Sequence, residues 1–275
     1  MLHAVPAASR KITKVERIDD RLKLYSDYGL MAIAPVSESI IRISFTRETQ
    51  ITDETGLGIV YDRPYVNWQF DESDSHIHLR TDALTLKISK ETASIRYFDA
   101  DGKLLLAERG KESKILDSFD AYKVVTQGQT KVDVIKTPDG EKRVVRQADK
   151  IFDKKLYRTT LHLDWQKDEA LFGLGQAEEG LLNLRGSTQY LHQANMKIAV
   201  PFLLSTKGYG LLLAADSPAI FNDTAHGSYW YAEACIKMDY YFIAGNNFDK
   251  IIQGYRLLSG KAVMLPKWAF GYQQS

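Results

Sequence analysis

The sequence has very little cysteine: Cys235 is the single one among 275 residues. One thiol cannot build an internal disulfide framework or a cysteine-based zinc site, so both are excluded. We interpret Cys235 as a small buried or half-buried residue. The sequence gives no reason to assign a bound metal or a cofactor.

The chain also lacks an excess of charge and a long apolar run. Thirty-six Lys and Arg against 35 Asp and Glu leave a formal charge of +1, whereas nucleic-acid binding needs a concentrated basic face. The most apolar stretches, 198–204 and 211–215, are far shorter than the ~20 residues of a membrane-spanning helix. We therefore expect neither a nucleic-acid nor a membrane partner. The N-terminus shows no basic leader before an apolar block, which favours a cytoplasmic protein.

Alternation of apolar and polar residues dominates the first two-thirds of the chain. It is clear over 41–46, 84–88 and 157–165, and it predicts strands with one buried face and one solvent-exposed face. Turn sequences separate such runs at Asp99–Gly102 and Thr137–Gly140, each with a glycine suited to a tight hairpin. Many short strands joined by hairpins predict a mainly β fold, an antiparallel β-sandwich.

Helical spacing replaces this alternation near the C-terminus. Apolar residues recur at Phe248, Ile251, Ile252, Tyr255 and Leu258. Asn246 or Asn247 can cap the start of this helix, and Gly260 can end it. A new apolar run at 269–272 then predicts the start of another strand. We expect a β-sandwich domain over 1–245, a helical connector over 246–267, and the start of a further domain over 268–275.

Two patterns suggest nucleotide binding or metal binding, but the residues around them do not support either function. The sequence FGLGQ at 172–176 is part of a dinucleotide-binding pattern, but the third glycine is replaced by Glu178 and no βαβ pattern surrounds it. His76 and His78 share one face of a predicted strand, but a metal site needs further ligands. We interpret the glycines as easing a strand end and the histidines as lying on a solvated face.

The stretch 191–197, LHQANMK, is the strongest candidate for ligand contact. It is rich in amides and directly precedes the apolar strand 198–204. Loops that flank buried strands commonly carry binding residues, and amides offer both donors and acceptors to sugar hydroxyls. A loop held together by its own hydrogen bonds is the alternative.

From residue 171 onward the chain resembles the N-terminal part of glycoside hydrolase family 31, the retaining α-glucosidases and α-xylosidases. The resemblance lies in three pieces: FGLGQ at 172–176, IAVPFLLSTKGYGLLL at 198–213, and the segment 248–275. The last is the most specific, with Gly260 followed by the Pro266-x-Trp268-x-x-Gly271 pattern. The first 170 residues match only in strand character.

The resemblance implies a mutarotase-like β-sandwich whose connecting helix leads toward a (β/α)₈ barrel absent from these 275 residues. The catalytic carboxylates of the family lie in that barrel, so we nominate no catalytic residue here and expect this chain alone to be inactive. The loop before the apolar strand is expected to reach the substrate site. Gln193, Asn195 and Met196 are the implied substrate-binding residues, and Asn195 stands where the family often has an aspartate.

The implied partners are an α-linked oligosaccharide or glycoside and the catalytic barrel, and a homo-oligomer stays open. The choice between glucosidase and xylosidase also stays open. Two other functions are weighed against this one. A free-standing carbohydrate-binding sandwich would explain the amide-rich loop and the 15 tyrosines, but not segment 248–275. An aldose epimerase would need a histidine acid and a carboxylate base in one pocket, and no motif links His76, His78 or His162 to a carboxylate.

Overall fold

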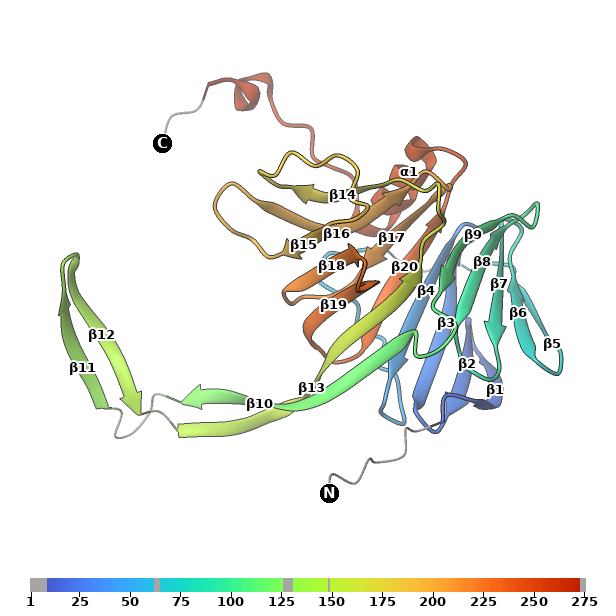
Figure 1. Ribbon diagram of the computed structural model, residues 1–275, viewed down its shortest axis with the longest axis horizontal. Coiled ribbons are helices and arrows are strands. Elements are labelled where there is room, and N and C mark those ends of the chain that lie inside the picture. Colours follow the sequence, from blue (N-terminus) through green and yellow to red (C-terminus); the bar gives the residue numbers. More distant parts are fainter. Residues whose placement is uncertain (1–8, 62–64, 126–130, 148, 273–275) are drawn as a thin grey trace.

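Two large antiparallel sheets pack face to face in the computed structural model, which describes residues 9–61, 65–125, 131–147 and 149–272 (Figure 1). The eight-stranded sheet has the order β1 (Ile12–Ile18), β2 (Arg21–Ser26), β3 (Gly29–Ser37), β4 (Ile40–Thr46), β20 (Met238–Ala244), β17 (Tyr209–Leu213), β16 (Ile198–Ser205) and β14 (Leu171–Gln176).

The second sheet contains ten strands. Nine of them follow the order β15 (Thr188–Leu191), β18 (Ala219–Thr224), β19 (Gly227–Cys235), β13 (Asp149–Asp164), β9 (Leu104–Glu108), β8 (Ile95–Asp99), β7 (Leu84–Ser89), β6 (His76–Arg80) and β5 (Gln69–Glu72), and β10 (Lys114–Val125) pairs with β13. A separate hairpin consists of β11 (Lys131–Thr137) and β12 (Gly140–Gln147). This architecture confirms the predicted antiparallel sandwich.

The main core lies between the two sheets. Leu86 and Tyr97 of the ten-stranded sheet and Ile43 and Phe242 of the eight-stranded sheet belong to one cluster of fully buried side chains. The Tyr97 and Phe242 rings stack across this interface with centroids 4.2 Å apart. The alternation in β7 is as predicted, with every second residue buried. Inward-facing side chains of both sheets thus form one core, as a sandwich requires.

Both predicted hairpin turns are present. The first joins β8 to β9 with Gly102 at φ 78°, and the second joins β11 to β12 with Gly140 at φ 118°. These backbone angles lie in the left-handed region, where a side chain would be strained. The glycines of the two turn sequences therefore have the role that was predicted for them.

The alternation in β4 predicts a solvent-exposed face that the structure does not have. All seven residues of β4 are buried, Arg42 and Ser44 included. The segment around 52–54 covers this face: Arg42 Nη2 donates to the Glu54 carbonyl at 2.9 Å, and Lys237 Nζ donates to the same oxygen at 2.6 Å. Asp239 accepts from Arg42 Nε at 2.9 Å and balances part of the buried positive charge.

The helix α1 (Phe248–Ser259) confirms the predicted element and its boundaries. The side chain of Asn247 accepts a hydrogen bond from the Lys250 amide, and Gly260 ends the helix at φ 84°. The helix packs on the outer face of the eight-stranded sheet, where Ile251 and Leu258 join a second apolar cluster. The helical part of the 246–267 connector is therefore integrated into the body of the domain.

The described part of the C-terminal end, up to residue 272, is not a strand, and residues 273–275 of the predicted strand lie outside the described residues. Lys267–Phe270 forms one turn of 3₁₀ helix, and its large apolar side chains are exposed. A strand is stable only when a neighbour accepts its backbone hydrogen bonds, and in the described residues 268–272 the chain meets no such neighbour. In the part of the chain that the structure describes, no helix has the length and apolar character needed to cross a membrane.

Candidate functional site

The loop 192–197 passes from one sheet to the other at an edge of the sandwich. It connects β15, the edge strand of the ten-stranded sheet, to β16, which lies next to the edge strand β14 of the eight-stranded sheet. Its tip is a tight turn in which the Lys197 amide donates to the Ala194 carbonyl at 3.2 Å. Met196 has φ 59° in this turn, a left-handed conformation that is costly for a residue with a side chain.

Gln193 holds the loop together from inside. Its Nε2 donates to the Lys197 carbonyl at 2.9 Å, and its Oε1 accepts from the Ala199 amide at 3.4 Å. One N–H and part of the acceptor capacity of the amide stay free for a ligand. The structure thus shows the self-bonded loop that was the alternative interpretation, with Gln193 as its central residue.

Asn195 and Met196 occupy the tip of this loop. Both side chains are exposed, Met196 by 67%. Met196 lines a hollow beside the loop together with Gln193, whereas Asn195 lies outside the lining. The three predicted residues are therefore neighbours on one turn, but only two of them face the same hollow.

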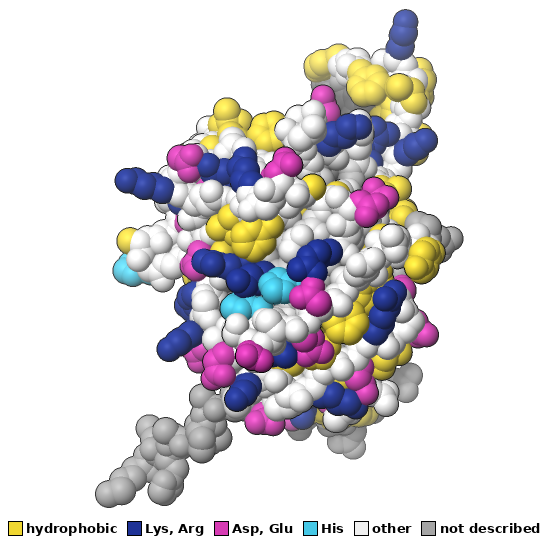
Figure 2. Space-filling view, turned by 90° about the vertical axis from the view of Figure 1, so that its right-hand side faces the viewer, with side chains coloured by type: hydrophobic (Ala, Val, Ile, Leu, Met, Phe, Trp, Pro, Cys, Tyr) yellow, Lys and Arg dark blue, Asp and Glu magenta, His cyan; other side chains and the backbone are white. Residues whose placement is uncertain are grey.

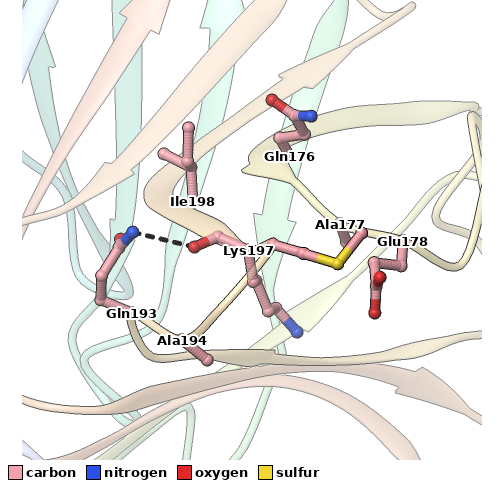
Figure 3. A pocket seen from close by; sticks show the side chains of 8 residues that line it. Gln176, Ala177, Glu178, Gln193, Ala194, Lys197 and Ile198 are labelled. Carbon is pink, nitrogen blue, oxygen red and sulfur yellow. Dashed lines mark hydrogen bonds between the residues drawn. The ribbon is translucent and has the colours of Figure 1, made fainter. Parts of the chain in front are cut away.

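The hollow has a volume of about 560 Å³ and lies between the loop and the end of β14 (Figure 3). Gln176, Ala177 and Glu178 form its side opposite Gln193 and Lys197. The register of β14 with β16 explains this, because Gln176 is paired with Ile198 directly after the loop. Pairing of distant segments thus brings the FGLGQ motif and the amide-rich loop together.

The backbone of β14 can lie this close to β16 only because β14 contains two glycines. Gly173, Leu174 and Gly175 have φ angles of 106°, 66° and 96°. A Cβ on Gly175 would lie 2.0 Å from the Ile198 carbonyl oxygen, and one on Gly173 would lie 2.5 Å from that of Phe202. The FGLGQ glycines therefore have a structural role, which confirms their interpretation as easing a strand end.

Sequence reasoning missed Gln176, Glu178 and Lys197 as lining residues. Glu178 was considered as the residue that breaks a nucleotide-binding pattern and, with Glu179, as an exposed carboxylate pair. Lys197 was considered only as the last residue of the loop. What brings these residues together is the pairing of 172–176 with 198–205, because Gln176 is opposite Ile198 and the residues after Gln176 therefore lie beside the loop that precedes Ile198. A single sequence does not reveal which strands are neighbours.

The lining combines one carboxylate, one ammonium group, two amides and apolar side chains. These groups can hydrogen-bond to sugar hydroxyls. Retaining glycoside hydrolysis needs two carboxyl groups about 5–5.5 Å apart, and Glu178 is the one carboxylate among the lining residues. Across the described ranges, no group of three or more His, Cys, Asp and Glu side chains is arranged to hold a metal ion. The arrangement supports binding and offers no catalytic pair.

The predicted solvated histidines lie on the outer face of β6. Figure 2 shows that side of the molecule, where acidic, basic and histidine side chains are intermixed. The His76 and His78 rings are 6.4 Å apart, and His78 Nδ1 lies 3.1 Å from Asp71 Oδ2. Burial lowers the pKa of His76, and the nearby Lys87 adds to the effect.

His162 lies apart from this pair, on β13. Its ring meets Tyr229 edge-to-face at 5.7 Å. Burial lowers its pKa, with a further contribution from Arg109. His78 does meet a carboxylate, but on an open sheet face, so the acid–base pocket required for an epimerase is not formed by these residues.

Two antiparallel sheets with a shared core, a glycine-twisted edge strand and a loop crossing between the sheets define a galactose mutarotase-like β-sandwich. Residues 30–221 match the family described as the glycosyl hydrolase 31 N-terminal galactose mutarotase-like domain. The chain belongs to this family, and the match concerns its N-terminal domain rather than a catalytic barrel.

Curated relatives are glycoside-processing enzymes that are much longer than this chain. An α-xylosidase of Saccharolobus solfataricus is 43% identical over 103 residues, which are 38% of this chain and 14% of the relative. α-Glucosidase 2 of Bacillus thermoamyloliquefaciens is 21% identical over 266 residues, covering 91% of this chain and 29% of the relative. The chain thus spans less than a third of the length of either.

Solved structures share the fold over nearly the whole chain. A GH31 dextranase of Flavobacterium johnsoniae, solved with isomaltotriose, has a TM-score of 0.73 at 19% identity and covers 97% of this chain and 30% of its own. A GH31 α-xylosidase of Xanthomonas citri has a TM-score of 0.73 at 17% identity. The match covers 94% of this chain and 41% of the xylosidase chain. At this level of identity the similarity is one of fold.

Proposed function

We propose that this chain is the N-terminal, non-catalytic β-sandwich of a retaining α-glycosidase that hydrolyses α-glucosidic or α-xylosidic bonds. The observation that carries this proposal is family membership over residues 30–221, together with α-xylosidase and α-glucosidase relatives. Catalysis would belong to the barrel that follows the sandwich in a longer polypeptide. We further propose a cytoplasmic location, supported by the lone, buried Cys235 and the near-neutral charge.

In this proposal the loop 192–197 and the hollow beside it form one wall of the substrate site. Asn195 would donate and accept hydrogen bonds to a sugar hydroxyl, since its side chain is exposed and the described residues give it no hydrogen bond. Met196 would contact an apolar face of the sugar, and Gln193 would hold both in place. An amide in place of a carboxylate keeps the hydrogen bond but brings no charge.

The hollow by itself is a poor sugar site. Sugar-binding sites are deep and commonly include aromatic faces on which the ring packs, whereas the eight residues lining this hollow include no aromatic side chain. The remaining walls would come from the barrel. We therefore expect weak or undetectable sugar affinity in residues 1–275 alone.

Activity measurements test the proposal directly. The complete coding sequence and residues 1–275 would be assayed on 4-nitrophenyl α-glucoside and α-xyloside. We expect turnover by the complete enzyme and none by residues 1–275. Turnover by residues 1–275 alone, or no hydrolysis of any α-glycoside by the complete enzyme, would contradict the proposal.

Calorimetry separates this proposal from a free-standing carbohydrate-binding sandwich. Residues 1–275 would be titrated with glucose, maltose and xylose. Binding on the order of tens of micromolar or tighter, equivalent to about −6 kcal/mol or better, would favour the free-standing module. We expect no such binding.

The role of Asn195 is tested in the complete enzyme. Asn195→Ala should raise KM about fivefold to tenfold, the cost of one lost hydrogen bond of about 1 kcal/mol or slightly more. Asp74→Asn, in the exposed turn between β5 and β6, is the matched control and should leave KM unchanged. Equal KM values for all three proteins would remove Asn195 from the substrate site.

A further inference from the structure

A two-stranded ribbon projects from the body of the sandwich. β13 pairs with β19 only over 157–162, whereas its pairing with β10 continues outward through 149–154 opposite 121–125. Figure 1 shows this ribbon leaving the body and leading to the β11–β12 hairpin. At about 3.3 Å per residue, the outer six residues of β13 alone extend about 20 Å beyond the sheet.

One face of the ribbon carries an uncovered apolar group. Tyr122 lies opposite Phe152, and their rings meet edge-to-face with centroids 6.2 Å apart. Val124 follows on the same face, and the three side chains are exposed by 53%, 56% and 61% in the order Tyr122, Phe152, Val124. We call these three residues the ribbon face. The opposite face carries Ile151 and the ion pair of Lys123 with Asp153 at 2.5 Å.

Such a ribbon needs a partner for stability. An isolated pair of strands is at best marginally stable in water, because it has no apolar surface to bury. Exposed contiguous apolar groups mark interaction sites. The ribbon face is therefore expected to be covered in the functional protein.

The side of the molecule on which the ribbon projects indicates what covers it. In Figure 1 the ribbon, the β14–β16 edge and the C-terminal segment after α1 all extend toward the same side. Exposed apolar side chains mark each of them, with Met196 and Ile198 at the sheet edge and Met264 and Trp268 in the C-terminal segment. The curated relatives described above extend far beyond the length matched by this chain. A large partner on this side would cover all three surfaces at once.

We propose that the ribbon face docks on the catalytic portion of the same polypeptide, which would follow residue 275, and holds it against the flank that carries loop 192–197. This inference rests on the proposed function for the existence of that portion. The ribbon and the C-terminal segment would then contact the catalytic portion at two separate places, and the loop 192–197 would lie between them.

A second copy of the chain is the competing occupant, and charge disfavours it. Residues 121–154 contain eight Lys and Arg against five Asp and Glu, a net charge of +3. In a two-fold symmetric dimer built on this face, the two ribbons would meet each other. Like charges would then be brought together, which opposes the association.

Cross-linking of the complete enzyme tests the proposal. In a complete enzyme whose accessible cysteines after residue 275 have been replaced by serine, Val124→Cys places a single reactive thiol on the ribbon face, since Cys235 is buried. A maleimide carrying a photoactivatable group then reports its neighbours by mass spectrometry. We expect cross-links to residues beyond 275. Asp74→Cys, in the turn between β5 and β6 on the far side of the molecule, is the control and should give none.

A mixture of isotopically light and heavy enzyme distinguishes the two occupants. Cross-links within one isotopic form support the proposal. Hybrid light–heavy cross-links would assign the ribbon face to a second copy and overturn it, as would a Val124→Cys pattern equal to that of Asp74→Cys. The readout needs no substrate, so it is independent of whether the complete protein hydrolyses α-glycosides.

Thermal unfolding gives a second test. Tyr122→Ser with Phe152→Ser should lower the unfolding midpoint of the complete enzyme by several degrees, but change that of residues 1–275 by much less, because the face is already exposed there. Ile151→Ser, on the opposite face and exposed by 56%, is the matched control. Equal shifts for the two sets of substitutions in the complete enzyme would contradict docking through the ribbon face.

Discussion

Two single residues, Gly173 and Gly175, determine how closely the edge strand β14 can lie against β16 beside the candidate site. Gly173 and Gly175 adopt left-handed backbone angles, and the carbonyl oxygens of β16 occupy the space that a side chain would need. The approach brings Gln176 opposite Ile198 and so forms one side of the hollow. The geometry of the site therefore depends on residues that have no side chain.

Gly175→Ala is predicted to destabilise the domain by about 3 kcal/mol or more, because a Cβ would lie 2.0 Å from the Ile198 carbonyl oxygen and the backbone has φ 96°. Gly180→Ala is the matched control, since Gly180 also has a positive φ of 66° but nothing within 4 Å of the added atom. It should cost about 1 kcal/mol. Urea unfolding measures both, and equal losses would show that contact with β16 is not the cause.

Asp223 gives a pH-dependent prediction. Burial acts to raise its pKa, but hydrogen bonds from Ser228 Oγ at 2.5 Å, the Gly186 amide at 2.9 Å and Arg185 Nε at 2.7 Å outweigh this, so the pKa lies below its ordinary 3.8. A carboxylate with a lowered pKa in the folded state stabilises the fold above the unfolded pKa. This contribution is lost as the pH falls through the folded pKa.

Asp223→Asn should therefore lower the urea midpoint at pH 7, and the difference from the parent should shrink as the pH falls below about 4. Asp74→Asn, in an exposed turn, should change the midpoint little at either pH. A difference for Asp223→Asn that is the same at pH 7 and pH 3 would show that ionisation of this carboxylate does not contribute to stability.

Among the elements, helix α1 shows how an expected connector becomes part of the body. Gly254 allows the helix to lie close to β20, since a Cβ there would meet Ile243 Cγ2 at 2.5 Å. The Phe202 and Tyr255 rings stack with centroids 4.4 Å apart. The helix therefore positions the following C-terminal segment through a packed interface.

The adjacent residues Ile251 and Ile252 test this packing. Ile251 is fully buried against β17 and β20, whereas Ile252 is exposed by 40%. Ile251→Ala should cost about 2–5 kcal/mol, since it removes buried methyl groups and leaves a cavity. Ile252→Ala should cost less than about 1 kcal/mol, because the side chain stays partly in water. Similar losses for the two variants in chemical denaturation would contradict docking of α1 through Ile251.

Elements were predicted well wherever local pattern determines them. The hairpin at Gly102, the helix ending at Gly260 and the alternation in β7 follow from turn chemistry, capping and periodicity. The burial of Arg42 could not be predicted, because it results from the segment around 52–54 covering the sheet and from an ion pair with Asp239, which lies 197 residues away in the sequence. The same holds for the site: the amide-rich loop was recognisable from composition, but its contact with the end of β14 depends on the pairing of β14 with β16, which joins Gln176 to Ile198 and Leu171 to Ser205.

At the scale of the whole molecule, the two sheets are joined by a polar network as well as by apolar packing. Glu108 of β9 is buried and accepts hydrogen bonds from Tyr240 of β20 and from Lys114. Ser113 Oγ also donates to Glu108 at 3.0 Å, and Tyr240 meets the Tyr97 hydroxyl at 2.8 Å. Burial raises the pKa of Tyr240, and the Glu108 carboxylate raises it further, so the hydroxyl remains a donor.

Glu108→Gln is predicted to destabilise the sandwich by about 3–5 kcal/mol, because it preserves the size of the side chain but leaves the Lys114 ammonium buried without its anionic partner. Burial already lowers the pKa of Lys114, against the raising effect of Glu108. Glu16→Gln breaks the exposed pair of Lys14 with Glu16 and should leave the free energy of unfolding nearly unchanged, because water screens this pair. Adding Lys114→Met to Glu108→Gln should recover part of the loss, since the unpaired charge is then removed. Guanidinium unfolding of the parent, Glu108→Gln, Lys114→Met and the double variant gives the coupling between Glu108 and Lys114. A loss below about 1 kcal/mol for Glu108→Gln would mean that apolar packing alone holds the sheets together.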